Sequence, residues 1–412
     1  MADRKVSCPV VEFDHHAPEL ALDPWSRYKE MREQCPVAHT EAWGGYKVVT
    51  RYREVAAIAK DTKTFSSAHD IDGTGNGYQG VTIPAPPMRS IPVELDPPEH
   101  TKFRKLLTEV FSPAATESRR HRIEEICRSF VDAVAPRGTC DLVDDIATPI
   151  PAAVTLEILG MPIDKWERYA LPMHTIAYAT PGSDEYDEAI AGLAWIMNDV
   201  QEEITRRRDD GMPRDDLLND LMVADVEGAT LADQTLLEIA YLVIVGGLDN
   251  TASLLANTFL YLHHRHDDRA RLRGDLDLTH TAFDKFLRFF SVTQAESRTA
   301  TCDTEIDGYP IAEGERILIV WASANRDPEM FDRPDEIVLD RNPNRHLGFG
   351  WGPHRCVGAG LGKEIFSSAL QATLERLPDY RVLEDGVRKY PTASLAYGYS
   401  AMPAVFTPTP GS

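Results

Sequence analysis

Cysteine is scarce in this chain, and its six copies are scattered along 412 residues. No two of them form a C-x-x-C pair, and no spacing among them is typical of a metal site or of a disulfide framework. Five are interpreted as small buried apolar residues. Cys356 differs from the others because glycines crowd the residues around it. The six positions are Cys8, Cys35, Cys127, Cys140, Cys302 and Cys356.

Long apolar runs and an excess of positive charge are also missing. No apolar segment approaches the roughly 20 residues that a membrane span needs, and the N-terminal segment MADRKVSCPVVEFDHHAPEL lacks the apolar core of a signal peptide. The formal net charge is -22, which opposes binding to nucleic acid or to an anionic membrane surface. We therefore expect a cytoplasmic protein with neither of these partners.

The chain has no internal repeats, no low-complexity tracts and no linker that would divide it, so we expect a single domain over residues 1–412. Apolar residues at helical spacing dominate from about residue 97 onward. Strand patterns are short, as in YKVVTRY (46–52) and the hairpin-like run TEIDGYPIAEGERILIV (304–320). A Gly/Pro-rich stretch at 71–88 predicts an irregular loop. The expected fold class is mainly α with a small β region.

The stretch HLGFGWGPHRCVGAGLGKE (346–364) carries the clearest chemical signal. A helix is predicted directly after Cys356, and the first amide N–H groups of a helix stabilise a thiolate. Gly348, Gly350 and Gly352 allow the backbone to pack closely against a flat group. These are the requirements of a thiolate that binds haem iron axially. From this spacing alone, a buried structural cysteine in a Gly-rich turn stays an open alternative.

The motif FGWGPHRCVG (349–358) matches the signature F-G-x-G-x-H-x-C-x-G of the haem-thiolate monooxygenases at every fixed position. The chain is identified by this resemblance as a member of the cytochrome P450 family, and other family elements follow in order along nearly the whole chain. The resemblance implies a triangular, mainly α fold with haem b (iron protoporphyrin IX) between a long central helix and the cysteine loop. It also implies that Cys356 is the axial iron ligand and that Phe349 and Gly358 bind the cofactor.

In this family the haem propionates are typically held by a histidine and an arginine on one helix, an arginine on a strand, and the histidine two residues before the cysteine. The segment EHTKFRKLL offers His100 and Arg104, which are four residues apart and can converge on one carboxylate. Arg298 in AESRTAT and His354 complete the set that the resemblance implies.

A helical pattern from about Ala232 to His266 is long enough to cross the core. Its centre, IVGGLDNTAS (244–253), resembles the oxygen-activation segment of the family. A glycine inside a helix costs up to about 1 kcal/mol, so the Gly-Gly pair indicates a packing or functional requirement.

Three residues of this centre are the expected catalytic residues: Asp249, Asn250 and Thr251. Asp249 falls at the acidic position of the family and is expected to feed protons from outside through water. Asn250 stands where threonine is usual, and its amide can position that water or hydrogen-bond a polar atom of the substrate. In the alternative, Asn250 only stabilises a local opening of the helix, while Thr251 or the substrate holds the water.

The helix after the long one departs from the family pattern. Members normally carry Glu-x-x-Arg here, but FDKFLRFF (283–290) keeps Arg288 and places Lys285 at the glutamate position. Because this reverses a charge, we expect Arg288 to pair with Asp340 or with another acid of the meander segment at 325–341.

The resemblance implies a monooxygenase that inserts one atom of O2 into a small hydrophobic substrate. Soluble bacterial members usually receive electrons from NAD(P)H through a flavoprotein reductase and an iron–sulfur ferredoxin, and Arg345, Arg355 and Lys363 are predicted to offer a docking patch. The segments GGLD and GYSAMPAVF (398–406) are similar to the camphor-hydroxylase group, which favours a terpenoid or small aromatic substrate, with fatty acids and macrolides still open. The residues expected to face the substrate are Tyr78, Leu242, Val245, Gly246, Thr293 and Leu395.

Two other functions stay open at this point. One is a haem-thiolate enzyme that uses peroxide or rearranges its substrate without a reductase, which the acid at Asp249 disfavours. The other is a haem-thiolate redox or gas sensor without catalytic activity, which the missing glutamate and threonine would suit.

Overall fold

The computed structural model describes residues 8–70, 77–211 and 213–409. Helices dominate and the strands are short, so the expected mainly α class with a small β region is confirmed. The helices are α1 (Pro18–Leu22), α2 (Pro24–Gln34), α3 (Tyr52–Lys60), α4 (Glu99–Val110), α5 (Pro113–Val134), α6 (Pro149–Leu159), α7 (Trp166–Tyr178), α8 (Asp184–Asp210), α9 (Leu217–Val223), α10 (Asp233–His264), α11 (His266–Gly274), α12 (Leu278–Phe290), α13 (Trp321–Ala324) and α14 (Ala359–Arg376).

The main sheet joins strands from the two halves of the chain, in the order β1-β2-β10-β7-β3. Strand β10 runs parallel to β2, with Leu318 opposite Val48, and antiparallel to β7, with Leu318 opposite Ser297. The strands of this sheet are β1 (Val37–Thr40), β2 (Tyr46–Val49), β3 (Phe65–Ser66), β7 (Glu296–Ala300) and β10 (Arg316–Ile319). The smaller sheets are β4 (Thr139–Asp141) with β14 (Pro403–Val405) and β11 (Arg381–Val382), β5 (Asp225–Val226) with β6 (Ala229–Thr230), β8 (Thr304–Ile306) with β9 (Tyr309–Ile311), and β12 (Arg388–Lys389) with β13 (Tyr399–Ala401).

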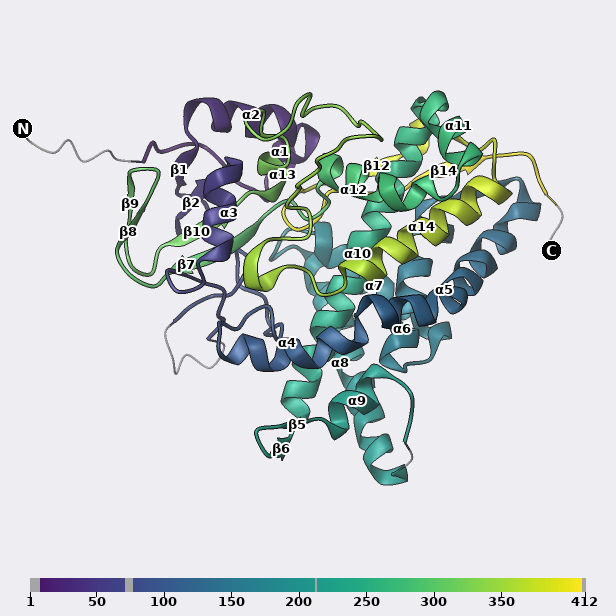
Figure 1. Ribbon diagram of the computed structural model, residues 1–412, viewed down its shortest axis with the longest axis horizontal. Coiled ribbons are helices and arrows are strands. Elements are labelled where there is room, and N and C mark those ends of the chain that lie inside the picture. Colours follow the sequence, from purple (N-terminus) through teal and green to yellow (C-terminus); the bar gives the residue numbers. More distant parts are fainter. Residues whose placement is uncertain (1–7, 71–76, 212, 410–412) are drawn as a thin grey trace, which may run out of the picture.

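Helix α10 runs through the middle of a wedge-shaped molecule, with the main sheet at one side and helices filling the rest (Figure 1). Gly247 explains part of the Gly-Gly pair in this helix, because a Cβ there would lie only 2.4 Å from Thr155 Oγ1 on α6. A Cβ on Gly246 would meet no atom within 4 Å. The first glycine therefore borders open space, and the second lets α10 and α6 approach closely.

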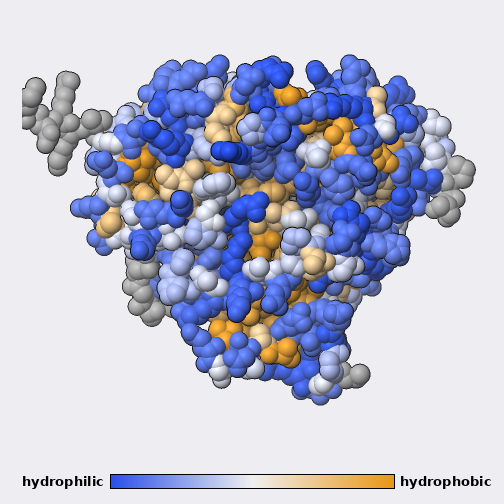
Figure 2. Space-filling view, in the orientation of Figure 1, coloured by the Kyte–Doolittle hydropathy of each residue, from blue (hydrophilic) through white to orange (hydrophobic). Residues whose placement is uncertain are grey.

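By length and composition alone, α10 could cross a membrane. This corrects the expectation that no apolar segment is long enough for a membrane span. However, 72% of its most apolar 18-residue window is buried inside the protein. Such burial is what the central helix of a protein core requires. Figure 2 shows a mostly hydrophilic face of the molecule, with apolar residues gathered in its middle and near α4 and α9.

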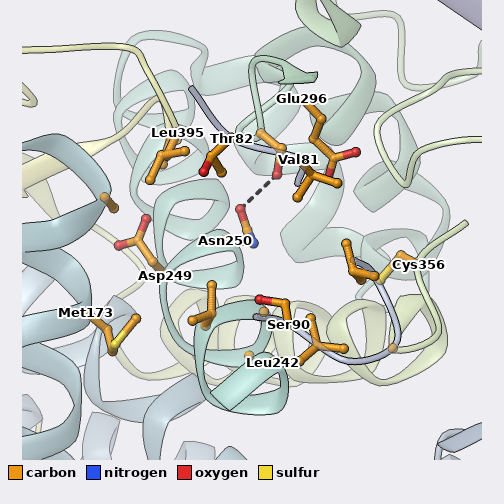
Figure 3. A pocket seen from close by; sticks show the side chains of 18 of the residues that line it. Val81, Thr82, Ser90, Met173, Leu242, Asp249, Asn250, Glu296, Cys356 and Leu395 are labelled. Carbon is orange, nitrogen blue, oxygen red and sulfur yellow. Dashed lines mark hydrogen bonds between the residues drawn. The ribbon is translucent and has the colours of Figure 1, made fainter. Parts of the chain in front are cut away.

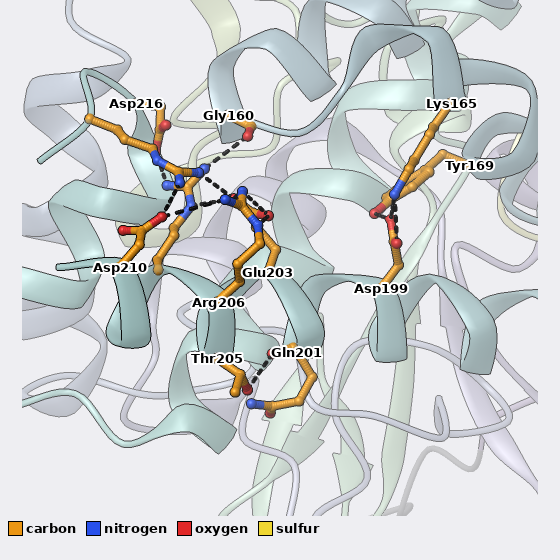
Figure 4. Close-up of polar contacts among 12 residues, drawn as sticks. Gly160, Lys165, Tyr169, Asp199, Gln201, Glu203, Thr205, Arg206, Asp210 and Asp216 are labelled. Atoms are coloured by element: carbon orange, nitrogen blue, oxygen red, sulfur yellow. Dashed lines mark hydrogen bonds and ion pairs between the residues drawn. The ribbon is translucent and has the colours of Figure 1, made fainter. Parts of the chain in front are cut away.

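Helix α8 is tied to the chain around α6 and α7 by a hydrogen bond and an ion pair (Figure 4). Arg207, which is held within α8 by Glu203 Oε1 at 2.6 Å, donates from Nη2 to the backbone oxygen of Gly160 at 2.8 Å. Lys165 Nζ pairs with Asp199 Oδ1 at 2.7 Å. These contacts hold α8 against two helices that form a wall of the central cavity.

Arg288 on α12 does not find the acidic partner that we expected. Its Nη1 donates to the backbone oxygens of Asn325 at 3.0 Å and Pro334 at 2.7 Å, and its Nη2 donates to the backbone oxygen of Glu336 at 2.6 Å. Asp340 pairs instead with an arginine of α11 at 2.7 Å. The predicted Arg288–Asp340 pair is therefore wrong, because backbone carbonyls of the meander already surround the guanidinium group.

Candidate active site

A cavity of about 410 Å³ lies between α10 and the cysteine loop. Its walls also include the segment 81–94, parts of α7 and α8, the start of β7 and residues 394–396. Figure 3 shows Cys356 at one side of the cavity, with Asn250 pointing towards its centre and Leu395 at another wall. Most of the lining side chains are apolar, so the cavity suits a hydrophobic ligand.

Most of the predicted substrate contacts line this cavity, but Tyr78 does not. The backbone oxygen of Tyr78 accepts a hydrogen bond from the amide of Asp70 at 2.9 Å, and the neighbouring Gln79 pairs with His69 in an antiparallel bridge. This pairing holds the segment beside residues 68–70, and the contact of Tyr78 with the substrate stays a prediction that the cavity wall does not support. The predicted residues that do line the cavity are Leu242, Val245, Gly246, Asp249, Asn250, Thr251, Thr293 and Leu395.

Cys356 lies in a tight loop that leads into α14. Its amide donates to the backbone oxygen of Phe349 at 2.8 Å. Gly350 and Gly352 have φ angles of +67° and +73°, which favour glycine. A Cβ on Gly352 would also lie 2.7 Å from the backbone oxygen of Ala59 on α3. The path of the loop and its packing on α3 therefore require glycine at these two positions, and Gly350 also lines the cavity.

The thiol of Cys356 faces the cavity. Burial raises its pKa, while the backbone amide of Gly358 and the guanidinium groups of Arg104 and Arg355 lower it. The expected amide at the start of the helix is present, but desolvation outweighs it in the polypeptide alone. A coordinating cation reverses this balance, since a thiol that binds a metal loses its proton.

The four residues expected to hold propionates form one cluster of buried or half-buried groups: His100, Arg104, Arg298 and His354. The rings of His100 and His354 lie with their centroids 4.3 Å apart. Burial and the charge of Arg104 lower the pKa of His100 to about 4. Burial lowers the pKa of His354 to about 2, with further contributions from Arg298, His100 and Arg104.

Among the described residues, Glu296 is the one carboxylate within ion-pair distance of this cluster, 3.6 Å from Arg298 Nη2. Both ring nitrogens of His100 and of His354, and the Nε of Arg298, are buried without a hydrogen-bond partner there. Buried polar groups are normally paired, so unpaired donors next to two arginines fit an external carboxylate. Haem meets this requirement with its two propionates, and Cys356 supplies the one thiol among the described residues that line the cavity.

On α10, the Asn250 and Asp249 side chains point in different directions. The hydroxyl of Thr293 donates to Asn250 Oδ1 at 2.9 Å. The carboxylate of Asp249 points away from Cys356 (Figure 3), and its Oδ1 lies 2.9 Å from His174 Nδ1 and 2.8 Å from the hydroxyl of Tyr390. Neither His174 nor Tyr390 was predicted from the sequence, because no local pattern marks either residue.

Two further acids of the cavity wall were also missed. Glu296 on β7 lies 3.6 Å from Arg298 Nη2. Its place could have been predicted from the sequence, because alternate residues of a strand share one face and Glu296 stands two residues before Arg298. Glu94 is fully buried, and its carboxylate accepts hydrogen bonds from the amides of Val81 at 3.0 Å and Ser90 at 2.8 Å. Glu94 therefore holds together the loop that forms one wall.

The predicted docking patch is only partly available. Arg345 and Arg355 are exposed, and Trp351 between them is 38% exposed. Lys363 instead pairs with Asp284 on α12 at 2.9 Å. Burial acts to raise the pKa of Asp284, but the bonds from a histidine and from Lys363 lower it to about 2, so the Asp284 carboxylate is ionised at neutral pH.

Comparisons with known proteins agree with this geometry. The family model described as Cytochrome P450 matches residues 153–378. A steroid C26-monooxygenase of Mycolicibacterium smegmatis is 32% identical over 393 residues, which cover 93% of this chain and 92% of that protein. The cytochrome P450 monooxygenase PikC of Streptomyces venezuelae is 32% identical over 379 residues, which cover 90% of this chain and 88% of that protein.

A solved structure shows the same fold. The Mycobacterium marinum cytochrome P450 CYP268A2 in complex with pseudoionone has a TM-score of 0.86 and 26% sequence identity, over 97% of this chain and 99% of that chain. Together with the family match and the two relatives, this places the chain in the cytochrome P450 family, whose members are monooxygenases that bind haem b through a cysteine thiolate.

Proposed function

We propose that this protein binds haem through Cys356 and inserts one oxygen atom into a small hydrophobic substrate that carries a hydrogen-bond acceptor. The observation that carries the second part is the contact of Thr293 with Asn250. Because the Thr293 hydroxyl occupies Asn250 Oδ1 at 2.9 Å, the Nδ2 donor of Asn250 is left to face the cavity. An ether, carbonyl or hydroxyl oxygen on the substrate would accept from this amide.

Bound haem supplies the redox chemistry that activates O2. Around it, His100, Arg104, Arg298 and His354 would hold the propionates, as their unpaired ring nitrogens and charges indicate. Overall, substrate, O2, two electrons and two protons give the hydroxylated product and water. Asp249 is the proposed source of these protons, and Asn250 is the proposed contact of the substrate or of the water that carries them.

The proposed substrate is of terpenoid or small aromatic type. The apolar wall residues and the cavity volume of about 410 Å³ support a compact hydrophobic molecule. One relative is named as a steroid C26-monooxygenase, and similar solved structures are complexes with testosterone and with erythromycin B. Compounds of these two kinds therefore belong in the same screen. The similarity to the camphor-hydroxylase group stays a prediction.

The screen should use pairs of ligands that differ in one oxygen, such as a cyclic ketone and its parent hydrocarbon. Binding of a good substrate changes the absorption spectrum of the haem, so each pair gives two dissociation constants. We expect the oxygenated member to bind about 2–10-fold more tightly, since one hydrogen bond contributes roughly 0.5–1.5 kcal/mol. Asn250→Leu should abolish this preference, and equal binding of both members to the unaltered protein would contradict the proposal.

Coupling separates the two roles of Asn250. In Asn250→Ala, a sharp fall in product formed per NADH consumed would support the positioning of water. Altered regioselectivity with intact coupling would support contact with the substrate. If coupling and regioselectivity both stay unchanged, Asn250 is a structural residue and both roles are wrong.

Electrons are proposed to arrive from NAD(P)H through a flavoprotein reductase and a ferredoxin that docks over the cysteine loop. Exposed Arg345, Arg355 and Trp351 support this place. Reduction by a ferredoxin should slow as salt rises, and Arg355→Glu should slow it further at low salt. Reduction that ignores both changes would place docking elsewhere.

We further propose that residues 1–412 form one domain in the cytoplasm. Support for a single domain comes from the main sheet, in which β2 pairs with β10 and β3 pairs with β7, so that strands from both halves of the chain are joined. Limited proteolysis that releases two stable halves would contradict this proposal.

A further inference from the structure

The carboxylate of Asp249 lies within a group of polar side chains from three parts of the fold. Oδ1 accepts a hydrogen bond from the hydroxyl of Tyr390, the residue after β12, at 2.8 Å. His174 Nδ1 on α7 lies 2.9 Å from the same oxygen and 3.0 Å from the Tyr390 hydroxyl. The hydroxyl of Ser253, one turn later on α10, donates to Oδ2 at 3.2 Å. Asp249 is thus held by contacts on both of its oxygens.

Of these partners, the imidazole is the group whose two ring nitrogens can both accept and donate a proton. Burial, and then the charge of Asp249, raise the pKa of Tyr390 well above its ordinary value, so its hydroxyl keeps its proton. The hydroxyl of Ser253 does not titrate. Histidine is the side chain whose ordinary pKa lies near neutrality. Among the described residues that contact the Asp249 carboxylate, His174 is therefore the one suited to take up and release a proton.

The contact between His174 and Asp249 is largely buried, since the two side chains are 11% and 8% exposed. Asp144, on the π-helical turn Val143–Ala147, is a further acid that interacts electrostatically with His174, and it is exposed. Partial desolvation, ahead of the charge of Asp141, raises the pKa of Asp144, and His174 lowers it. The other ring nitrogen of His174, Nε2, is buried without a hydrogen-bond partner in the described part of the chain.

Few other titratable groups surround the His174 ring. Tyr178, one turn later on α7, packs edge-on against it with centroids 5.8 Å apart, and its hydroxyl donates to Glu185 on α8 at 3.2 Å. Tyr390 packs against it from the opposite element with centroids 5.2 Å apart. Burial raises the pKa of Tyr178, so neither tyrosine competes with histidine for protons near neutral pH.

We propose that His174 is the positioning residue through which Asp249 recovers its proton, with Tyr390 holding Oδ1 against the ring. A proton from solvent binds Nε2 of the neutral ring. The Nδ1–H bond then breaks as the Oδ1–H bond of Asp249 forms, which leaves a neutral ring that carries its proton on Nε2. The ring resets by exchanging this proton for one on Nδ1. This inference rests on the proposed monooxygenase function.

His174→Gln tests the proposal directly, because glutamine keeps an N–H donor for Asp249 but does not titrate. We expect product formed per NADH to fall by about tenfold or more, since a positioned proton donor contributes roughly 10²–10⁴ in rate. The solvent deuterium isotope effect should grow, and the dependence of coupling on pH should flatten.

His121→Gln is the matched control, because His121 is 85% exposed on α5 and pairs only with its helical neighbour Glu125. It should behave as the unaltered protein. Coupling and pH dependence that are unchanged in His174→Gln would show a purely structural contact. Faster turnover in that variant would show that His174 restrains Asp249 rather than supplying it, and either result overturns the proposal.

A second measurement does not depend on turnover. In the reduced carbonyl form of the holoprotein labelled with ¹⁵N-histidine, ring signals that disappear in His174→Gln belong to His174. They are expected to move between about pH 5 and 8, where histidines change charge, and to move differently in Asp249→Asn. Constant signals over this range would overturn the proposal. If no redox partner supports product formation, the proposed function fails, whereas these spectra still decide whether His174 exchanges protons.

Discussion

Lys285 lies one turn before a buried arginine, Arg288, that has no acidic partner among the described residues, and this makes one substitution informative. Arg288 is fully buried, and burial lowers its pKa to about 9, with Arg341 and Arg326 adding to the shift. The change from 12.5 corresponds to roughly 5 kcal/mol against the charged form. Three backbone oxygens accept from Nη1 and Nη2, but Nε is buried without a partner among the described residues.

Lys285→Glu would place a carboxylate one turn before Arg288 on α12, where residues three apart are neighbours. An acceptor for Arg288 Nε would remove an unsatisfied buried donor, which costs roughly 1–3 kcal/mol. Burial of part of the new carboxylate, and loss of the attraction between Lys285 and Asp284, offset some of this gain. We therefore expect a net stabilisation of about 1–2 kcal/mol.

Thermal unfolding of the holoprotein measures this change, followed by haem absorbance and circular dichroism at one fixed scan rate. An unfolding entropy of about 2.1 cal/mol/K per residue over 412 residues amounts to roughly 0.9 kcal/mol/K, so the expected rise in Tm is about 1–2 °C. Pairing with Arg288 would lower the pKa of the new glutamate in the folded state. The contribution of this glutamate to stability is then fully present above about pH 4.3, its pKa in the unfolded state, and is lost as pH falls through its pKa in the folded state.

Lys285→Gln is the control, because it removes the positive charge without adding a carboxylate. It should change Tm by less than about 0.5 °C, since replacements away from a specific contact have small effects. If the glutamate and glutamine variants shift Tm equally, the gain comes from losing the lysine. If the glutamate variant is less stable than the unaltered protein, the carbonyl oxygens already satisfy Arg288 and the reasoning is refuted.

Three further predictions concern the cysteine loop, the central helix and the N-terminal segment. Cys356→His should abolish the red-shifted thiolate band of the reduced carbonyl complex. Replacement of the exposed Cys302 by serine is the control and should leave the band unchanged. A band that persists in Cys356→His would disprove the ligand assignment. Gly247→Ala should destabilise by about 1–3 kcal/mol in denaturant unfolding, because its Cβ would lie 2.4 Å from Thr155 Oγ1, while Gly246→Ala, with no atom within 4 Å, should not. Burial lowers the pKa of His15 to about 3, so the unfolded state binds more protons than the folded state between about pH 3 and 6.5. The free energy of unfolding should therefore fall as pH drops through that range. In His15→Gln, the free energy of unfolding measured against pH should fall less steeply.

The residues near the cysteine could be predicted because the chemistry of a haem-thiolate site is concentrated in a few adjacent positions. The loop from Phe349 to Gly358 brings its own backbone amide, its own positive-φ glycines and its own thiol. His100 and Arg104 share one helix face, which spacing also shows. Arg298 and His354 required the family resemblance, since only the tertiary structure brings their strand and loop to the same cluster.

The partners of Asp249 could not be predicted in the same way. His174 lies 75 residues before it and Tyr390 lies 141 residues after it. Each is an ordinary polar residue in its local segment, so neither helical nor strand periodicity distinguishes it. Their contact depends on how α7 and the end of β12 pack on α10, and on Gly398, where a Cβ would lie 2.4 Å from Ser253 Oγ and 2.7 Å from the Tyr390 ring.

The error over Arg288 has a different cause, because the residues were identified and the type of partner was wrong. A search for the partner of a buried cation looks for aspartate or glutamate, since these are the acceptors that a sequence displays. Every residue also carries a backbone oxygen, and the partners of Arg288 are three such oxygens in the meander, from Asn325, Pro334 and Glu336. The path of the meander around α12 determines which backbone oxygens converge on Arg288. Although Lys285 replaces the usual glutamate, Arg288 therefore still binds the meander, through backbone contacts that residue types alone do not indicate.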